Sequence, residues 1–156
     1  MPGTAGTGFP PRAPPSRLLR RLRSRRVVVV DASMEPTVRE GDRLWVEPTR
    51  HVTRGEIVVV RDPEDDGRLL VKRVGACGGD RILVTRTGVR PAEPSEGVHP
   101  PTDALEALVV PPDAIFLVSD SPSGARDSRR FGPVGLDRLI GRAWFRYFPP
   151  ARRGDL

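Results

Sequence analysis

Two residues suited to covalent catalysis, Ser33 and Lys72, stand 39 positions apart in this chain of 156 residues. Lys72 is the only lysine, because 25 of the 26 basic residues are arginine. Where arginine supplies nearly every positive charge, a single lysine indicates a task that arginine cannot perform, and losing a proton is such a task. The hydroxyl of Ser33 could then attack a carbonyl carbon if the lysine amine accepts its proton.

The residues around Lys72 predict a strand that buries it. Leu70, Lys72 and Val74 alternate with Val71 and Arg73, so a period of two places the first three on one face. Desolvation among apolar neighbours lowers the pKa of an amine and makes the neutral form available as a general base. From this pattern alone, the alternative is a surface lysine whose amine reaches the solvent.

Ser33 follows a run of four valines, residues 27–30, which predicts a strand. Pro36 lacks a backbone N–H and disfavours helical geometry at Glu35, so the chain is expected to turn away just after Ser33. The hydroxyl would then lie at the end of a strand. Serines in such positions are common and usually inert, so the position alone does not identify a nucleophile.

The whole pattern predicts an all-β fold, an antiparallel barrel or sandwich of short strands with one or two short helices. Glycine, proline and aspartate separate the apolar runs. The predicted strands span residues 27–30, 43–47, 56–61, 68–74, 81–85, 114–119 and 142–148. One or two helical turns are expected over 103–109 and 136–140, and a proline-rich surface loop over 91–102.

Composition divides the chain into three parts. Residues 1–26 hold seven arginines and no acid, which predicts a disordered, proline-rich leader that becomes basic near its end. Residues 27–150 form the predicted catalytic domain, and 151–156 a short tail. Beyond residue 26 there are 19 basic and 20 acidic residues, so the net charge of +6 belongs to the leader. We expect no nucleic-acid partner, because a nucleic-acid-binding domain carries its positive charge within the fold.

Residues 17–26 could form a short basic helix that favours an anionic membrane surface by about 1 kcal/mol per arginine; the alternative is a solvated leader. No apolar run approaches the ~18–20 residues that cross a bilayer. The four valines are too few for a cleavable signal. A cytoplasmic or peripheral membrane location is therefore expected. One cysteine (Cys77) and two histidines in loop-like stretches predict no disulfide, metal or cofactor.

Five ordered blocks resemble the signal peptidase I family. They are Ser33-Met34-x-Pro36-Thr37, Gly41-Asp42, residues 54–60, Lys72-Arg73-Val74 with Gly79-Asp80, and residues 127–134. The resemblance covers residues 27–150 in the family's order. It implies an all-β catalytic domain with a Ser/Lys dyad and no catalytic histidine. It also implies an endopeptidase that removes signal peptides or propeptides from precursor N-termini after small residues, as in Ala-x-Ala.

The resemblance assigns roles to the matching positions. Ser33 would attack the scissile carbonyl, Lys72 would take its proton, and the Ser33 backbone N–H would contribute to the oxyanion hole. Met34 and Pro36 would lie along the substrate groove, with Met34 shielding the dyad.

Near the C-terminus, Asp127 and Arg129 would form a structural ion pair that, with Ser128 between them, holds the last block against the site.

Three positions depart from the family pattern. Asp31 stands where the family often has serine or glycine near the oxyanion hole. A carboxylate there would repel a developing oxyanion, so Asp31 must point away, be protonated or impair catalysis. Ala125 falls where a family serine often orients the lysine, and Ser119-Asp120-Ser121 replaces the usual Gly-Asp-Asn. Reduced or specialised activity would follow.

Typical family members are also tethered by N-terminal spans. Anchorless relatives include the nickel superoxide dismutase maturation proteases, whose last block, like residues 119–122 here, has proline in fourth place.

Two other functions fit parts of the sequence. Self-cleaving SOS repressors share a Ser/Lys dyad, but residues 1–26 are too short for their DNA-binding domain, and Cys77-Gly78 follows the lysine rather than preceding it. A non-catalytic module that binds a membrane surface or a partner protein would explain Asp31 and Ala125, but not the solitary Lys72.

Overall fold

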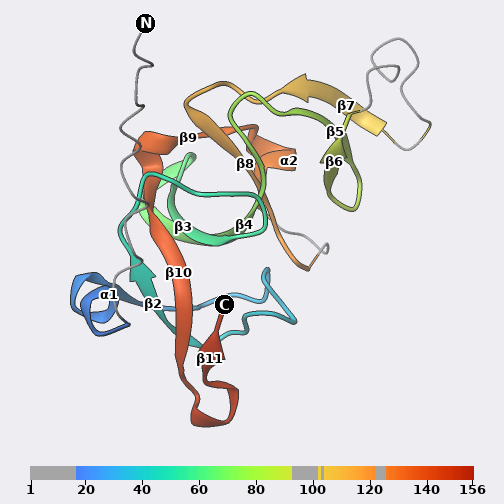
Figure 1. Cartoon of the computed structure of the whole chain (residues 1–156). Helices are drawn as coiled ribbons and strands as arrows, with labels where there is room; N and C mark the ends of the chain where they lie inside the picture. Colours follow the sequence, from blue (N-terminus) through green and yellow to red (C-terminus); the bar gives the residue numbers. More distant parts are fainter. Residues whose placement is uncertain (1–16, 93–101, 103, 122–125) are drawn as a thin grey trace, which may run out of the picture.

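Two antiparallel β-sheets make up most of the chain in the computed structural model, which describes residues 17–92, 102, 104–121 and 126–156 (Figure 1). The all-β prediction is confirmed. The described strands form open sheets, not a closed barrel. The predicted leader over 1–16 and most of the predicted loop over 91–102 lie outside the described residues.

The larger sheet has the strand order β1-β2-β10-β3-β4-β8-β9, and β11 pairs with β10. Its strands are β1 (Arg25–Val28), β2 (Arg43–Glu47), β3 (Ile57–Asp62), β4 (Asp65–Cys77), β8 (Ala114–Val118), β9 (Val134–Gly135), β10 (Leu139–Phe148) and β11 (Gly154–Asp155). Because β10 lies between β2 and β3, the C-terminal part of the chain completes a sheet that begins near the N-terminus.

The smaller sheet has the order β6-β5-β7, with strands β5 (Arg81–Thr85), β6 (Val89–Pro91) and β7 (Ala104–Val109). The helical turns expected over 103–109 are wrong, because β7 pairs along β5 from Arg81↔Val109 to Thr85↔Ala104. Its alanines, leucines and glutamate favour helix locally, and pairing with a neighbouring strand overrides that weak preference. Over 136–140 the structure has one 3₁₀ turn, η2 (Leu136–Arg138), before β10 begins.

Three apolar clusters form the core. The first holds Met34 and Val38 from the segment after β1, packed on residues of β2, β3 and β10. The second holds Leu70 and Val74 of β4 with residues of β3 and β8. The third lies between β8 and the smaller sheet. The serine and the lysine are thus carried by segments anchored in adjoining parts of the core.

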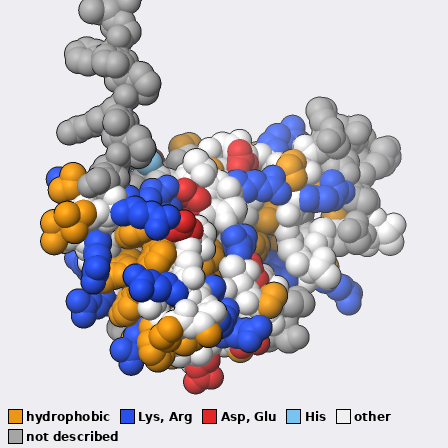
Figure 2. Space-filling model, turned by 60° about the horizontal axis from the view of Figure 1, so that its bottom comes forward, with side chains coloured by type: hydrophobic (Ala, Val, Ile, Leu, Met, Phe, Trp, Pro, Cys, Tyr) orange, Lys and Arg blue, Asp and Glu red, His pale blue; other side chains and the backbone are white. Residues whose placement is uncertain are grey.

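Both ends of the described chain join the larger sheet. The short basic helix is present as α1 (Arg17–Arg23), and β1 begins at Arg25, which pairs with Val46. After residue 150 the chain forms the 3₁₀ turn η3 (Pro150–Arg152) and then β11. No helix among the described residues is both long enough and apolar enough to cross a membrane. On one face of the molecule, basic side chains surround apolar ones (Figure 2).

Candidate active site

Ser33 lies in the turn that the sequence predicts. β1 ends at Val28, and Val29 still exchanges hydrogen bonds with Gly41 and Asp42 at 2.9 Å each. The chain then turns over residues 31–38, with the Val38 N–H donating to the Met34 carbonyl at 2.9 Å. The nucleophile candidate therefore stands directly after the first strand, on a turn fixed by its own backbone hydrogen bonds.

Lys72 lies on β4 with its side chain inside the protein. Leu70, Lys72 and Val74 are all buried, as their alternation predicts, and Lys72 is only 1% exposed. Its Nζ is hydrogen bonded to the Oγ of Ser33. The structure thus brings together the two side chains that the sequence singles out.

Burial shifts the pKa of Lys72 below its ordinary value, because a charged ammonium is poorly solvated there. The negative charges of Asp31 and Asp127 act in the opposite direction without reversing the shift. The amine therefore loses its proton at a lower pH than an exposed lysine does, which is the property a general base needs.

Asp31 points toward the nucleophile. Its Oδ1 accepts the Ser33 backbone N–H at 2.9 Å. Burial alone would raise the pKa of Asp31, but hydrogen bonds from Ser33 and the charge of Lys72 outweigh burial and hold the pKa below its ordinary value. Of the three possibilities left by the sequence, pointing away and being protonated therefore do not apply, and a charged carboxylate occupies the predicted oxyanion-hole donor.

A second set of contacts, which the sequence interpretation missed, fixes the turn that carries Ser33. The Ser121 N–H donates to the Ser33 carbonyl at 3.0 Å. Arg73 donates to both carboxylate oxygens of Asp120, at 2.7 and 2.6 Å, and to Thr37 Oγ1 at 3.3 Å. Arg73 follows the lysine directly, so the loop after β8 and the nucleophile turn are held to the same strand.

The block 127–131 supports that loop. Asp127 is fully buried and caps α2 (Ser128–Phe131), accepting the Arg129 N–H at 3.1 Å and the Ser119 N–H at 2.9 Å. The predicted ion pair is present, with Arg129 Nη2 2.6 Å from Asp127 Oδ2. Ser128 Oγ accepts the Leu117 N–H at 2.9 Å. Ala125 lies outside the described residues.

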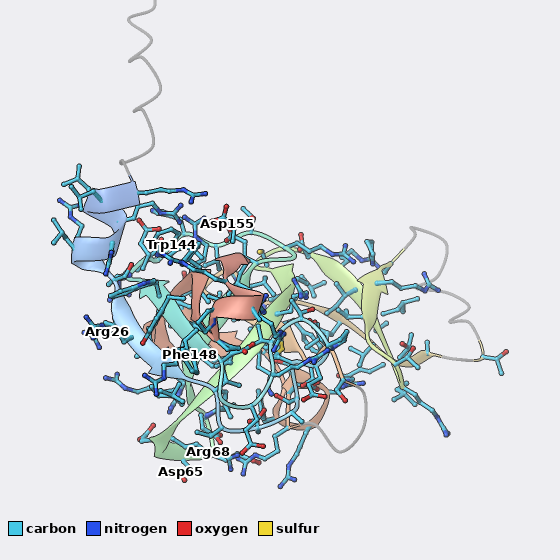
Figure 3. All side chains as sticks on the ribbon, turned by 90° about the horizontal axis from the view of Figure 1, so that it is seen from below. Arg26, Asp65, Arg68, Trp144, Phe148 and Asp155 are labelled. Carbon is cyan, nitrogen blue, oxygen red and sulfur yellow. The ribbon has the colours of Figure 1, made fainter. Side chains whose placement is uncertain are left out.

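A cleft of about 410 Å³ opens beside Asp31, between residues 26–31 and residues 67–71. Its walls come from two strand edges: β1 pairs only with β2, and β4 meets β8 only from Arg73 onward. Among the described residues, no strand pairs with the edges that face this cleft. Figure 3 labels Arg26 on β1 and Arg68 on β4, which line its two sides.

Two residues predicted in the substrate groove lie elsewhere. Met34 is fully buried in the first core cluster, where its side chain packs under the nucleophile turn. Pro36 is exposed, follows a cis peptide bond, and its carbonyl accepts a hydrogen bond from Arg152. Neither residue lines the cleft. The spacing from Ser33 placed both residues near the site, but it could not show which way the turn directs them.

Comparison with known proteins gives a consistent result. Residues 17–148 match the family described as "Signal peptidase, peptidase S26". The chain is 34% identical over 140 residues to "Probable signal peptidase I-1" of Synechocystis sp. (strain ATCC 27184 / PCC 6803 / Kazusa), covering 80% of this chain and 71% of that protein. It is 33% identical over 129 residues to the mitochondrial ATP-independent inner membrane protease subunit 1a of Arabidopsis thaliana, covering 80% of this chain and 70% of that protein. A solved signal peptidase I from Enterococcus faecalis V583 has a TM-score of 0.44 at 17% identity, covering 59% of this chain and 96% of that one. The extent of the family match and of the sequence identities confirms the resemblance: the chain belongs to the signal peptidase S26 family of serine-type endopeptidases.

Proposed function

We propose that this chain removes signal peptides or propeptides from precursor N-termini after small residues, with Ser33 as nucleophile and Lys72 as general base. The observation that carries the proposal is a buried lysine amine hydrogen bonded to a serine hydroxyl at the end of an open cleft. A serine hydroxyl needs an adjacent base to attack at neutral pH, and burial prepares this amine for that role.

The reaction follows from these two groups. Ser33 Oγ bonds to the scissile carbonyl carbon, the carbonyl π electrons move to oxygen, and the hydroxyl proton passes to Lys72 Nζ. Lys72 then gives that proton to the departing amine as the C–N bond breaks, leaving an acyl-enzyme. Water attacks the ester next, with Lys72 again accepting a proton, and Ser33 is regenerated.

The cleft suits an extended peptide. A substrate strand can pair with an open sheet edge, and its alternate side chains then face the same wall. This geometry accounts for a preference at two positions separated by one residue, −1 and −3 in the substrate. Val27, Leu69 and Val71 are among the apolar residues that line the walls.

We also propose that the enzyme works at a membrane surface, as the name of the Arabidopsis relative says of that protein. The basic segment 17–26 supports this proposal. The narrower likeness to nickel superoxide dismutase maturation proteases stays a prediction, because Pro122 of the block 119–122 lies outside the described residues. Incubation with a library of precursor N-termini would test it.

The dyad is tested with Ser33→Ala and Lys72→Arg. Each should lower cleavage of an Ala-x-Ala peptide by about a thousandfold or more, because one removes the nucleophile and the other replaces the base with a group that stays protonated. Circular dichroism would verify that both variants fold.

Matched controls are Thr102→Ala, which removes a hydroxyl from an exposed turn, and Arg61→Lys, which makes the reverse exchange on an exposed part of β3. Both should cleave at the wild-type rate. Activity that survives Lys72→Arg would refute the base assignment. A folded wild-type protein that cleaves no precursor would favour the non-catalytic module instead.

A further inference from the structure

The Ser33 backbone N–H has an internal partner before any substrate binds. It donates to the charged carboxylate of Asp31 at 2.9 Å, and a hydrogen bond to an ionised acceptor is among the stronger ones in proteins. The same N–H has to stabilise the negative oxygen that forms when Ser33 attacks. One amide proton cannot serve both anions well, and two anions at one donor repel each other. Catalysis therefore requires Asp31 to move.

Protonation does not supply that movement. The pKa of Asp31 lies below its ordinary value, with Lys72 and Arg68 as the charged groups that act on it. The carboxylate thus stays charged over the pH range in which Lys72, faced by Asp31, Asp127, Arg68 and Asp62, loses its proton. The release has to come from another partner for the carboxylate.

Arg68 is placed to be that partner. It lies on β4 across the cleft from residues 26–31, and its positive charge acts on both Asp31 and Lys72. Its side chain is exposed, and it makes no ion pair with any residue that the structure describes. A guanidinium presents several donors in one plane and accepts a carboxylate readily.

We propose that Asp31 and Arg68 form a substrate-driven gate: a peptide entering the cleft shifts the Asp31 carboxylate from the Ser33 N–H to the Arg68 guanidinium and so frees the oxyanion donor. Asp31 and Arg68 are positioning residues, since neither exchanges a proton or a bond with the substrate. The inference rests on the proposed peptidase function and adds a control step to it. Without substrate, the nucleophile is present but the site is incomplete.

A double-mutant cycle tests the gate, with Asp31→Ser, Arg68→Gln and the double variant assayed on an Ala-x-Ala peptide. Asp31→Ser should raise kcat by about tenfold or more, because the donor is then free and the anion is gone. Arg68→Gln should lower kcat by about tenfold in the wild-type background and have no effect once Asp31 is serine. Such non-additivity marks two residues that act through one interaction.

The controls are Glu40→Gln and Arg61→Gln, which remove an exposed acid and an exposed arginine outside the cleft. They should leave kcat unchanged. An Arg68→Gln effect of equal size in both backgrounds, or an unchanged kcat in Asp31→Ser, would overturn the gate while leaving the peptidase intact. Absence of any Ser33-dependent cleavage would instead count against the proposed function.

Two further readouts separate a gate from a merely structural role. The alkaline-rising limb of the kcat/KM profile should move to lower pH in Asp31→Ser, because the Asp31 charge raises the pKa of Lys72. A peptide aldehyde, whose carbonyl oxygen becomes negative when Ser33 adds to its carbon, should bind about tenfold more tightly to Asp31→Ser. Equal aldehyde affinity in wild type and variant would contradict the proposal.

A measurement independent of turnover uses the Ser33 amide resonance in ¹⁵N-correlated NMR. A peptide with an N-methylated scissile bond, which is bound but not cleaved, should shift this resonance toward its position in Asp31→Ser. Arg68→Gln should prevent the shift. A Ser33 resonance that stays in place on saturation with the peptide would refute the gate even in a protein without measurable turnover.

Discussion

Lys72 puts an ionisable amine where an apolar side chain would pack at a lower cost in free energy. It is 1% exposed and stands between Leu70 and Val74, both in the second core cluster. Burying an ionisable group disfavours its charged form, and the loss appears in the stability of the whole protein. The residue that supplies the chemistry is thus one the fold would replace if stability alone counted.

Lys72→Met should therefore stabilise the protein while abolishing cleavage. We expect the free energy of unfolding at pH 7 to rise by about 1–3 kcal/mol, measured by urea denaturation. Because the pKa of Lys72 is lowered in the folded state, the unfolded chain holds the proton more tightly, and wild-type stability increases as pH rises toward the ordinary lysine value. The advantage of methionine should shrink in the same direction. Arg61→Met on exposed β3 is the control, within about 0.5 kcal/mol of wild type; a destabilised Lys72→Met would contradict this reasoning.

The sequence identifies Ser33 and Lys72 because their types are unusual in their settings: one lysine among 25 arginines, and one serine between a strand and a proline. It does not predict where Asp31 points, since that depends on the dihedral angles of the turn. Nor does it pair Arg73 with Asp120, although both residues stand in the quoted blocks. With 25 arginines and 20 acids, charge alone permits too many pairings.

Among the elements, β4 was predictable and β7 was not. Apolar and polar residues alternate along β4, and this period of two survives as burial of alternate residues. The segment of β7 lacks such alternation, and most of its residues are exposed, so its structure comes from pairing with β5. Elements that bury one face can be recognised locally, whereas elements held mainly by a neighbour cannot.

The contact between β8 and α2 depends on one buried carboxylate. Asp127 accepts hydrogen bonds from Ser119 and Arg129, and although burial would raise its pKa, those bonds hold the pKa below its ordinary value. Asp127→Ala should lower the free energy of unfolding at pH 7 by about 3–5 kcal/mol, because Arg129 and the Ser119 N–H lose their partner. Thermal or urea denaturation measures the loss.

The matched control is Arg130→Ala, which removes the exposed pair with Glu64 at 3.6 Å and should change stability by less than about 0.5 kcal/mol. A lowered carboxylate pKa stabilises the fold above the unfolded value, and this stabilisation disappears as pH falls through the folded value. The difference between wild type and Asp127→Ala should therefore shrink in acid. A pH-independent difference would show that Asp127 acts by packing alone.

At the scale of the whole molecule, arginine and aromatic side chains gather beside the cleft. Arg20 lies over the ring of Trp144 at 4.5 Å, and Arg26 lies over Trp45 at 5.1 Å. Arg26 lines both a pocket of about 520 Å³ among these aromatic residues and the substrate cleft. Leu18 and Leu22 of α1 are 68% and 74% exposed. Arginines with exposed leucines and tryptophans suit the interface of an anionic bilayer.

Removing charge from this face should weaken membrane binding without affecting the chemistry. Arg23 and Arg25 are exposed and make no ion pair within the described ranges, so replacing both with glutamine should leave the fold intact. At about 1 kcal/mol per arginine, the double variant should bind vesicles rich in phosphatidylglycerol about 30-fold less tightly in a sedimentation assay. Added salt should reduce the difference, because screening shortens the reach of both charges. The control removes the same charge from the smaller sheet with Arg81→Gln and Arg86→Gln, which should bind like wild type. Both double variants should hydrolyse a soluble Ala-x-Ala peptide at the wild-type rate; equal vesicle binding by the two would show that net charge, and not this face, directs the protein to the membrane.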